Sequence, residues 1–410
     1  MGSEMCIRDR RWRLDVDRGP AEHGVYKYGA LWLAPTFLKE YWKVDPERGV
    51  ILQRFPMQGI VWGAPWVDKD GVYGATEGGV IRKFDHKGEV VWTIRTDLGD
   101  FKAESITEAW GKYIAVQFPK GIALVDKERG EVVWSDEWSP EGRSGQEPTY
   151  DQDEKLLWVC KPIAEDNLIS YNEEGKAVHK ITLPGYPTTY ACPQMWGDYI
   201  VVVCDRHIVV VDKRKGKIVW NIDLGRIRYG GKDEDALVGG PRTITPDGKL
   251  ILWTIDGLYT CFDLRTGTIL WRIDLMSLGY TTRSNTAYWS YGGVVATDGI
   301  AVFLGRNNLP KGNEYAYNRN RLFIIDYRTG EIVHVSDPKY KLACCCKPIL
   351  ARGKVIIGTW YKDSENREFT ACYYCWEIKG REEGRLEDKP YEWMGGLHHG
   401  GYGEGYIELN

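Results

Sequence analysis

The same tight turn recurs eight times along this chain of 410 residues, and it constrains the fold more than any other feature. In its clearest copy, apolar runs precede a turn bounded by Asp212 and Gly216, and a third run closes on Trp220. The aspartate can bond the turn's own backbone, and the glycine supplies the positive φ that a hairpin bulge needs. The turns occupy residues 45–49, 85–88, 126–130, 172–175, 212–216, 263–267, 326–330 and 377–380.

The spacing of these turns predicts the architecture. Successive closing glycines lie 39 to 63 residues apart, which suits units of four short strands. In the sixth unit, residues 249–253, 258–263 and 268–273 have the pattern of strands, and no helical stretch of useful length is found. We therefore predict an all-β, eight-bladed β-propeller of four-stranded antiparallel blades. Packing between blades is expected from the tryptophans that follow the turns, Trp92, Trp134, Trp220 and Trp271.

Closure of the ring is expected to involve the C-terminal strand. The first unit shows three strands, at 29–36, 37–45 and 49–55, whereas residues 402–409 (YGEGYIEL) form a spare one. We expect this strand to become the innermost strand of the first blade, because closure removes an exposed sheet edge. Residues 1–10 resemble translated adapter sequence, so a native start with any signal peptide is obscured. Residues 11–410 are predicted to form a single domain.

Charge and composition exclude some classes of function. The net charge of -4 and the pI near 6.1 argue against nucleic acid as a partner. No apolar run approaches the roughly 20 residues of a transmembrane helix. Five of the ten cysteines fall inside predicted strands, which favours buried thiols over a disulfide framework and suggests a reducing compartment. They are Cys160, Cys204, Cys261, Cys372 and Cys375.

Three segments, DKERGEVVW, DKRKGKIVW and DLRTGTILW, carry a family resemblance. They are similar to the pyrroloquinoline quinone (PQQ) repeat of quinoprotein-alcohol-dehydrogenase-like propellers, and the resemblance extends from about Gly29 to the end. It implies an eight-bladed propeller and a periplasmic or secreted protein, in contrast to the compartment that the thiols suggest. It does not fix the function, because the family includes dehydrogenases, outer-membrane assembly lipoproteins and binding proteins.

Ligands are expected on the face that carries the loops between blades and those between second and third strands. Three long insertions, at 226–240, 276–293 and 306–320, fall on this face and are rich in side chains that grip polar, carbohydrate-like molecules. They could equally cap the funnel or form an oligomer contact. The closing turns lie on the opposite face, where we expect their charges to be solvated. The candidate substrate-binding residues are Arg283, Trp289, Tyr291, His207, Lys347 and the two arginines that flank Ile227, Arg226 and Arg228.

The glycine-rich segment 395–404 supplies the candidate catalytic residues. His398, His399 and Tyr402 would face the funnel, with Tyr190 or Tyr280 as a further acid or base, because histidine and tyrosine suit proton transfer near neutral pH. Glu404 could instead be a hard ligand of a divalent metal ion. The paired histidines could also be incidental.

Cysteines near the axis offer a second candidate site. Cys192 and the run 344–346, which contains Cys345, could supply soft metal ligands or, by the family resemblance, a vicinal disulfide over a cofactor; simple buried thiols are the alternative. Cys372 and Cys375 have redox spacing, but on a strand they point to opposite faces. Three further histidines, His86, His179 and His334, are expected on turns or outer strands, away from the axis.

Three functions remain open at this point. The favoured hypothesis is a propeller that binds a polar saccharide and acts on it as a lyase, with Arg283 or Lys347 neutralising a carboxylate, or as a hydrolase with Glu104 and Glu147. The second is a scaffold that resembles outer-membrane assembly lipoproteins. The third is a PQQ-dependent dehydrogenase, for which Asp256 alone supplies no convincing calcium set.

Overall fold

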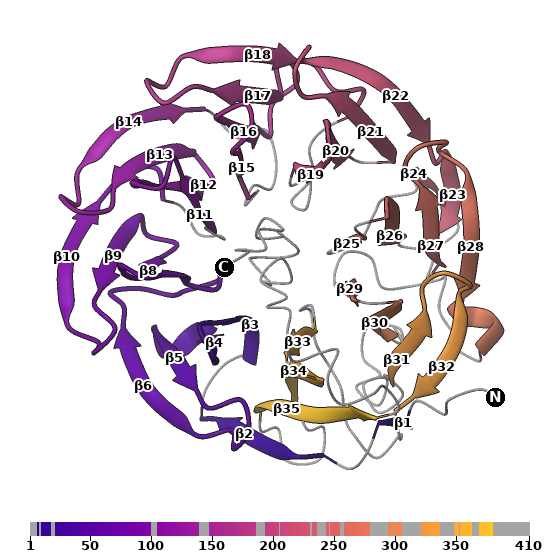
Figure 1. The fold of residues 1–410 in the computed structure, drawn as a ribbon, viewed down its shortest axis with the longest axis horizontal. Helices are drawn as coiled ribbons and strands as arrows, with labels where there is room; N and C mark the ends of the chain where they lie inside the picture. The colour runs from indigo at the N-terminus through magenta and orange to yellow at the C-terminus, as the bar shows by residue number, and fades with distance from the viewer. Residues whose placement is uncertain are drawn as a thin grey trace.

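Eight antiparallel sheets form a closed ring in the computed structural model of this chain (Figure 1). The structure describes residues 6–7, 10–17, 21–99, 105–138, 147–185, 193–204, 206–229, 232–235, 243–245, 247–254, 258–278, 294–297, 299–305, 321–336, 348–351, 353–362 and 369–379. In the first seven blades the first strand along the chain lies nearest the axis and the last lies at the perimeter. The predicted eight-bladed, all-β fold is therefore confirmed.

The first four blades follow the chain in order. The first blade contains β3 (Ala21–Lys27), β4 (Ala30–Pro35), β5 (Glu40–Val44) and β6 (Ile51–Pro56), with the short helix η1 (Thr36–Leu38) between β4 and β5. The second contains β7 (Trp66–Asp68), β8 (Gly71–Ala75), β9 (Val80–Phe84) and β10 (Val90–Arg95). The third contains β11 (Ser105–Ala109), β12 (Tyr113–Phe118), β13 (Gly121–Asp126) and β14 (Val132–Glu137). The fourth contains β15 (Thr149–Asp151), β16 (Leu156–Cys160), β17 (Leu168–Tyr171) and β18 (Ala177–Ile181).

The next three blades repeat this order. The fifth contains β19 (Gln194–Trp196), β20 (Tyr199–Cys204), β21 (His207–Asp212) and β22 (Lys217–Asp223). A hairpin of β23 (Arg226–Tyr229) and β24 (Lys232–Asp235) follows it. The sixth contains β25 (Thr243–Ile244), β26 (Lys249–Trp253), β27 (Leu258–Asp263) and β28 (Ile269–Asp274), followed by helix η2 (Leu275–Leu278). The seventh contains β29 (Val294–Thr297), β30 (Ile300–Gly305), β31 (Arg321–Asp326) and β32 (Glu331–Val335).

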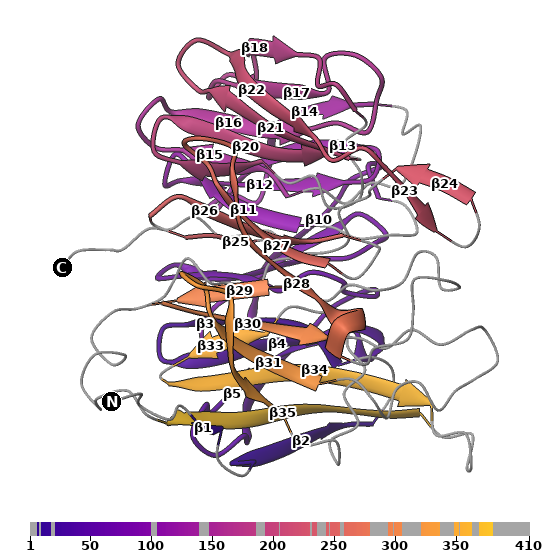
Figure 2. The same ribbon diagram turned by 90° about the vertical axis from the view of Figure 1, so that its right-hand side faces the viewer.

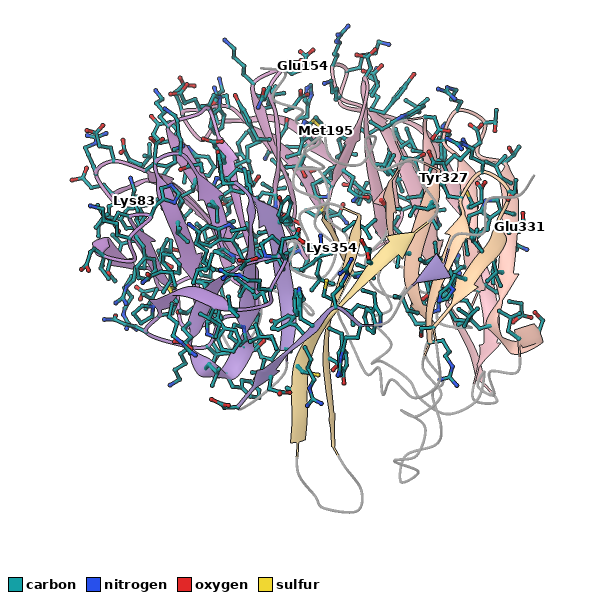
Figure 3. All side chains as sticks on the ribbon, turned by 60° about the horizontal axis from the view of Figure 1, so that its bottom comes forward. Lys83, Glu154, Met195, Tyr327, Glu331 and Lys354 are labelled. Atoms are coloured by element: carbon teal, nitrogen blue, oxygen red, sulfur yellow. The ribbon has the colours of Figure 1, made fainter. Side chains whose placement is uncertain are left out.

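The eighth blade closes the ring with a strand from the other end of the chain. It contains β33 (Ile349–Ala351), β34 (Lys354–Lys362) and β35 (Phe369–Lys379), and β2 (Trp12–Val16) pairs with β35 as its outermost strand. The two-residue strand β1 (Cys6–Ile7) also pairs with β35. Figure 3 shows β34 and β35 running on as a two-stranded ribbon beyond the body of the ring.

This closure corrects the expectation of a three-stranded first unit. The first blade already has four strands, because β3 supplies the inner one, and the N-terminal β2 joins the last blade. The alternation of β3 was missed because Gly24 interrupts it; a Cβ there would lie 2.6 Å from Cδ2 of Leu33 on β4, so the strands approach too closely for a side chain. Residues 402–409, which were expected to be the innermost strand, lie outside the described residues.

The closing turns have the predicted backbone. All seven described closing glycines have φ between 60° and 91°, as at Gly216 with φ of 60°. The Asp212 side chain accepts hydrogen bonds from the backbone N–H groups of Arg214 and Lys215 at 3.1 and 2.9 Å. A register shift follows each turn in the outer strand, as between the partners Val211 and Val210 on β21. Such bulges twist an edge strand and so discourage edge-to-edge pairing with other chains.

The core lies in the spaces between neighbouring blades, which Figure 3 shows filled with side chains. One apolar cluster, for example, joins Trp158 and Cys160 of the fourth blade to Val202 and Cys204 of the fifth. The middle strands are buried on both faces, whereas the outer strands alternate. Burial of apolar surface stabilises the folded state by about 25 cal/mol per Å². Each blade therefore depends on its two neighbours, because they cover its apolar side chains. In the described part of the chain, no helix is long and apolar enough to cross a membrane.

Candidate functional site

The described parts of the first two insertions, residues 226–229, 232–235 and 276–278, lie at one face of the ring. Figure 2 shows the hairpin β23–β24 and helix η2 at this face, on the right of the view. Strand β28 runs toward it and ends in η2, so the closing turn between Asp263 and Gly267, at the other end of β28, lies at the opposite face. The backbone of Arg226, Ile227 and Arg228 forms β23 and pairs with β24. The hairpin lies beside the outer half of the ring in Figure 1, not over its centre.

Most residues of the predicted site fall outside the described part of the chain. The proposed roles of these residues therefore remain predictions. They are His398, His399, Tyr402, Glu404, Tyr190, Tyr280, Arg283, Trp289, Tyr291, Lys347, Cys192, Cys345, Glu104 and Asp256.

His207 lies two strands away from the inner strand of its blade. It begins β21, pairs with Cys204 of β20 and Asp223 of the outer strand β22, and has its ring nitrogen Nδ1 3.4 Å from Oδ1 of Asn221. The inner strand of this blade is β19, with β20 between them. The loop between the second and third strands of this blade, β20 and β21, is thus very short. His207 follows this loop and is separated from the inner strand by β20.

Buried polar groups follow the inner half of the ring. Glu147 lies two residues before the inner strand β15 and is 2% exposed. Gln117 of the third blade donates a 2.9 Å hydrogen bond from Nε2 to the carbonyl of Cys160 in the fourth. Thr149 of the fourth blade donates one of 2.5 Å to the carbonyl of Pro193, just before the fifth. Gln117 and Thr149 thus join one blade to the next, and their hydrogen bonds offset part of the free energy that burial of a polar group costs.

At four of the seven described closing turns, a tryptophan of the preceding blade docks on the turn. A Cβ on Gly130 would lie 2.6 Å from Cγ of Trp92, and the indole N–H of Trp92 donates a 3.0 Å hydrogen bond to the carbonyl of Lys127. Trp12, Trp134 and Trp271 make the same contact at the next blade, with hydrogen bonds of 2.9, 3.0 and 2.8 Å to turn carbonyls. The predicted packing between blades is confirmed for all four tryptophans, since Trp220 also packs against the apolar cluster that joins the fifth and sixth blades. Trp220 differs, since Ile222 faces the closing glycine Gly267.

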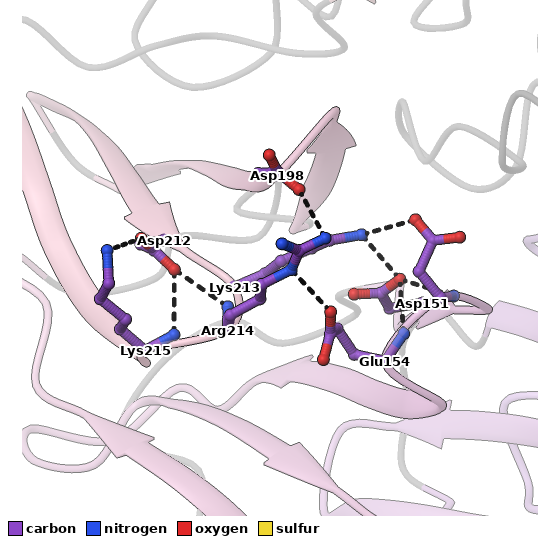
Figure 4. A network of polar contacts seen from close by, with 8 residues as sticks. Asp151, Glu154, Asp198, Asp212, Lys213, Arg214 and Lys215 are labelled. Carbon is purple, nitrogen blue, oxygen red and sulfur yellow. Dashed lines mark hydrogen bonds and ion pairs between the residues drawn. The ribbon is translucent and has the colours of Figure 1, made fainter.

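A buried ion pair joins the fourth and fifth blades (Figure 4). Nζ of Lys213 lies 2.9 Å from Oδ1 of Asp151 and 3.1 Å from Oδ2 of Asp153, and the side chains of Lys213 and Asp151 are 2% and 1% exposed. Burial lowers the pKa of Lys213, but the hydrogen bonds to the two aspartates outweigh it, so the pKa lies above the usual value. The expectation that closing-turn charges are solvated is wrong for this lysine. It holds for its neighbours Arg214 and Lys215, which are exposed.

Lys127 forms a second cross-blade ion pair. Its Nζ lies 2.8 Å from Oδ2 of Asp68 in the second blade and 2.5 Å from Oε1 of Glu108, and its side chain is 5% exposed. In both turns the lysine directly follows the turn aspartate, Asp126 or Asp212. The sixth and seventh turns have Leu264 and Tyr327 at this position, and both are buried. The apolar residues at this position in the sixth and seventh turns were the sequence signal that could have indicated its burial.

Neither a metal site nor a redox pair is found in the described part of the chain. No group of three or more His, Cys, Asp and Glu residues there could hold a metal ion. Cys372 and Cys375 are buried thiols on β35, as predicted. Cys160, Cys204 and Cys261 are buried thiols on β16, β20 and β27. Burial raises the pKa of Cys261 and of Cys375 to about 12. Such thiols are inert at neutral pH.

Solved structures of the same fold include both assembly factors and enzymes. BamB from Moraxella catarrhalis is 12% identical, with a TM-score of 0.61 over 91% of this chain and 100% of that one. Quinohemoprotein alcohol dehydrogenase from Comamonas testosteroni is 12% identical, with a TM-score of 0.65 over 93% of this chain and 77% of that one. A europium-containing methanol dehydrogenase is 11% identical, with a TM-score of 0.61 over 90% and 93% of the two chains. At these identities the likeness shows the fold alone.

The sequence itself matches one family profile, in three overlapping segments at residues 8–149, 119–230 and 204–358. Together these segments reach from the strand that closes the ring into the eighth blade. No curated protein sequence matches the chain. The profile is described as outer membrane protein assembly factor BamB, and the chain belongs to this family of PQQ-repeat propellers.

Proposed function

We propose that this chain is a non-catalytic scaffold that binds a protein partner during outer membrane protein assembly. The family match over residues 8–358 is the observation that carries this proposal, because it spans most of the ring and is described by that function. The BamB structure also matches over its whole length, whereas the quinohemoprotein dehydrogenase matches over 77% of its own.

The described ionisable residues support the same function. Lys127 and Lys213 are buried in ion pairs between blades, and Lys161 lies 2.5 Å from Asp136, which also accepts the hydroxyl hydrogen bond of Tyr171. These groups hold the ring together, and a rigid ring with loops on one face is suited to presenting a binding surface. A saccharide lyase and a PQQ-dependent dehydrogenase are the other two candidates, and no described residue favours either.

The test is the folding of an outer-membrane β-barrel protein. A small eight-stranded barrel protein, unfolded in urea, is diluted into lipid vesicles with and without the purified chain, and its folded fraction is followed by heat-modified gel mobility. We expect the chain to bind the unfolded barrel protein and to change its folding yield, with serum albumin as the control protein.

Two activity assays on the same preparation complete the test. Neither dye reduction with a primary alcohol, PQQ and calcium, nor new ultraviolet absorbance on polyuronates, is expected. Turnover in either assay, together with a barrel folding yield that the chain does not alter, overturns the scaffold proposal and assigns the matching enzyme class.

A further inference from the structure

We call the contact between two neighbouring blades a seam. One seam of the ring has a titratable side chain at the place where four others have tryptophan. At four of the seven described closing glycines, an indole ring of the preceding blade packs on the glycine. At Gly216 of the fifth blade the ring is the imidazole of His179, and a Cβ on Gly216 would lie 2.6 Å from its Cγ. His179 follows the bulge of its outer strand and pairs with Ser170, as Trp134 follows its own bulge and pairs with Leu124. The two residues therefore occupy equivalent positions.

His179 lies between a buried aromatic ring and the closing turn. Its ring stacks on that of Trp158, with 5.6 Å between centroids and 13° between planes, and Trp158 is fully buried. This position removes water from the imidazole and so disfavours its charged form. Burial accordingly lowers the pKa of His179, and the smaller, opposite effects come from Asp212 and Glu154.

Charged groups of both blades surround this seam. The fourth blade contributes Asp151, Asp153 and Glu154, and the fifth contributes Lys213 and Arg214 besides Asp212 (Figure 4). The acidic groups are engaged: Asp151 and Asp153 hold Lys213, Glu154 holds Arg214, and Asp212 holds Lys215. When His179 is protonated, it becomes a further cation in a seam whose carboxylates already pair with lysine or arginine.

We propose that the seam between the fourth and fifth blades is an acid-sensitive opening point of the ring, with His179 as its trigger. A neutral imidazole packs on Gly216 much as an indole does, whereas an imidazolium must give up its hydration to remain there. Above the pKa of histidine in an unfolded chain, about 6.5, the packing is complete. It weakens as the pH falls through that value, and the loss levels off below the lower pKa of the folded state.

Replacing the histidine with the residue used at the other seams tests this directly. In His179→Trp the fall in the midpoint of urea unfolding between pH 7.5 and pH 5.0 should be smaller than in the wild type, because the contribution of residue 179 is removed. Hydrogen exchange of the amides at 212–216, corrected for the intrinsic pH effect, should rise several-fold at pH 5.0 in the wild type and not in the variant. His179→Gln, which is smaller and does not titrate, gives the same comparison if the tryptophan does not fit.

A matched variant should create the same acid sensitivity at another seam. Trp134→His places an imidazole at the equivalent seam between the third and fourth blades, and exchange at 172–175 should then become acid-sensitive. His86→Gln, in an exposed turn, should leave the wild-type profile unchanged. If His179→Trp and His179→Gln retain the full acid response at 212–216, while Trp134→His gains none at 172–175, the proposal is overturned.

Discussion

The indole ring of Trp12 packs on Gly49, the closing glycine of the first blade, and its N–H donates a 2.9 Å hydrogen bond to the carbonyl of Pro46. Trp12 belongs to β2, which the chain contributes before its first blade, yet it docks as Trp92, Trp134 and Trp271 dock at other seams. The strand thus occupies the outer position of the eighth blade in full. The ring is closed by the same contact that joins its internal blades.

Truncating Trp12 should weaken this closure. Trp12→Ala removes a buried indole that is 7% exposed, and large aromatic truncations cost about 3–5 kcal/mol. Trp220→Ala is the control, because Trp220 is at the equivalent position but does not contact the closing glycine of the next blade. Urea unfolding followed by circular dichroism should show the larger shift for Trp12→Ala. Equal shifts would mean that the glycine contact contributes nothing to closure.

Alanine substitutions at two glycines should show how much of the loss of stability comes from backbone strain and how much from packing. Gly130 and Gly111 belong to the same blade and have φ of 67° and 70°, so alanine costs each about 1–2 kcal/mol of strain. A Cβ on Gly130 meets Trp92, whereas a Cβ on Gly111 has no atom within 4 Å. Gly130→Ala should therefore lose about 1–3 kcal/mol more than Gly111→Ala. The difference in their urea midpoints measures this, and an absent difference would refute the docking contact.

The fold was largely predictable because its determinants are local. The strands expected at 249–253 and 258–263 have those limits in the structure, since the aspartate, glycine and apolar alternation of each repeat act within one hairpin. The inner strand β3 was missed, since Gly24 interrupts its alternation to make room for Leu33. The closing role of β2 depends on the pairing of Trp12 with Cys375. These residues lie near opposite ends of the chain, so local sequence patterns do not contain this contact.

The polar interior was less predictable for the same reason. Lys213 stands in the turn DKRKG among other charged residues, and nothing nearby in sequence marks it as buried. Its partner Asp151 lies in the preceding blade, and the pairing exists only after the blades assemble. Candidate residues of the funnel, such as His398 and Arg283, were chosen by residue type and by the loops in which they were expected to lie. They lie outside the described residues, so their roles remain predictions.

Breaking the buried ion pair should be much costlier than breaking an exposed one. Lys213→Met leaves the buried Asp151 without its cation, for which about 3–5 kcal/mol is expected. Lys215→Met, two residues on, removes a lysine that is 73% exposed and should cost at most about 1 kcal/mol. The double variant Lys213→Met/Asp151→Asn should recover part of the loss, because no uncompensated charge remains. Urea midpoints of the three variants check this; no recovery would show that packing, not charge, explains the single substitution.

The five buried thiols should resist alkylation in the folded protein. They are Cys160, Cys204, Cys261, Cys372 and Cys375, all buried on strands, and burial raises the pKa of Cys261 and Cys375 to about 12. At pH 8 nearly all of Cys261 and Cys375 remains the unreactive thiol, since the thiolate is the nucleophile. Iodoacetamide at pH 8, followed by peptide mass spectrometry, should leave these five unmodified in buffer and label them fully in 8 M urea. Rapid labelling of the peptide that contains Cys372 and Cys375 in buffer would instead show that β35 opens, and that β2 does not hold the ring shut.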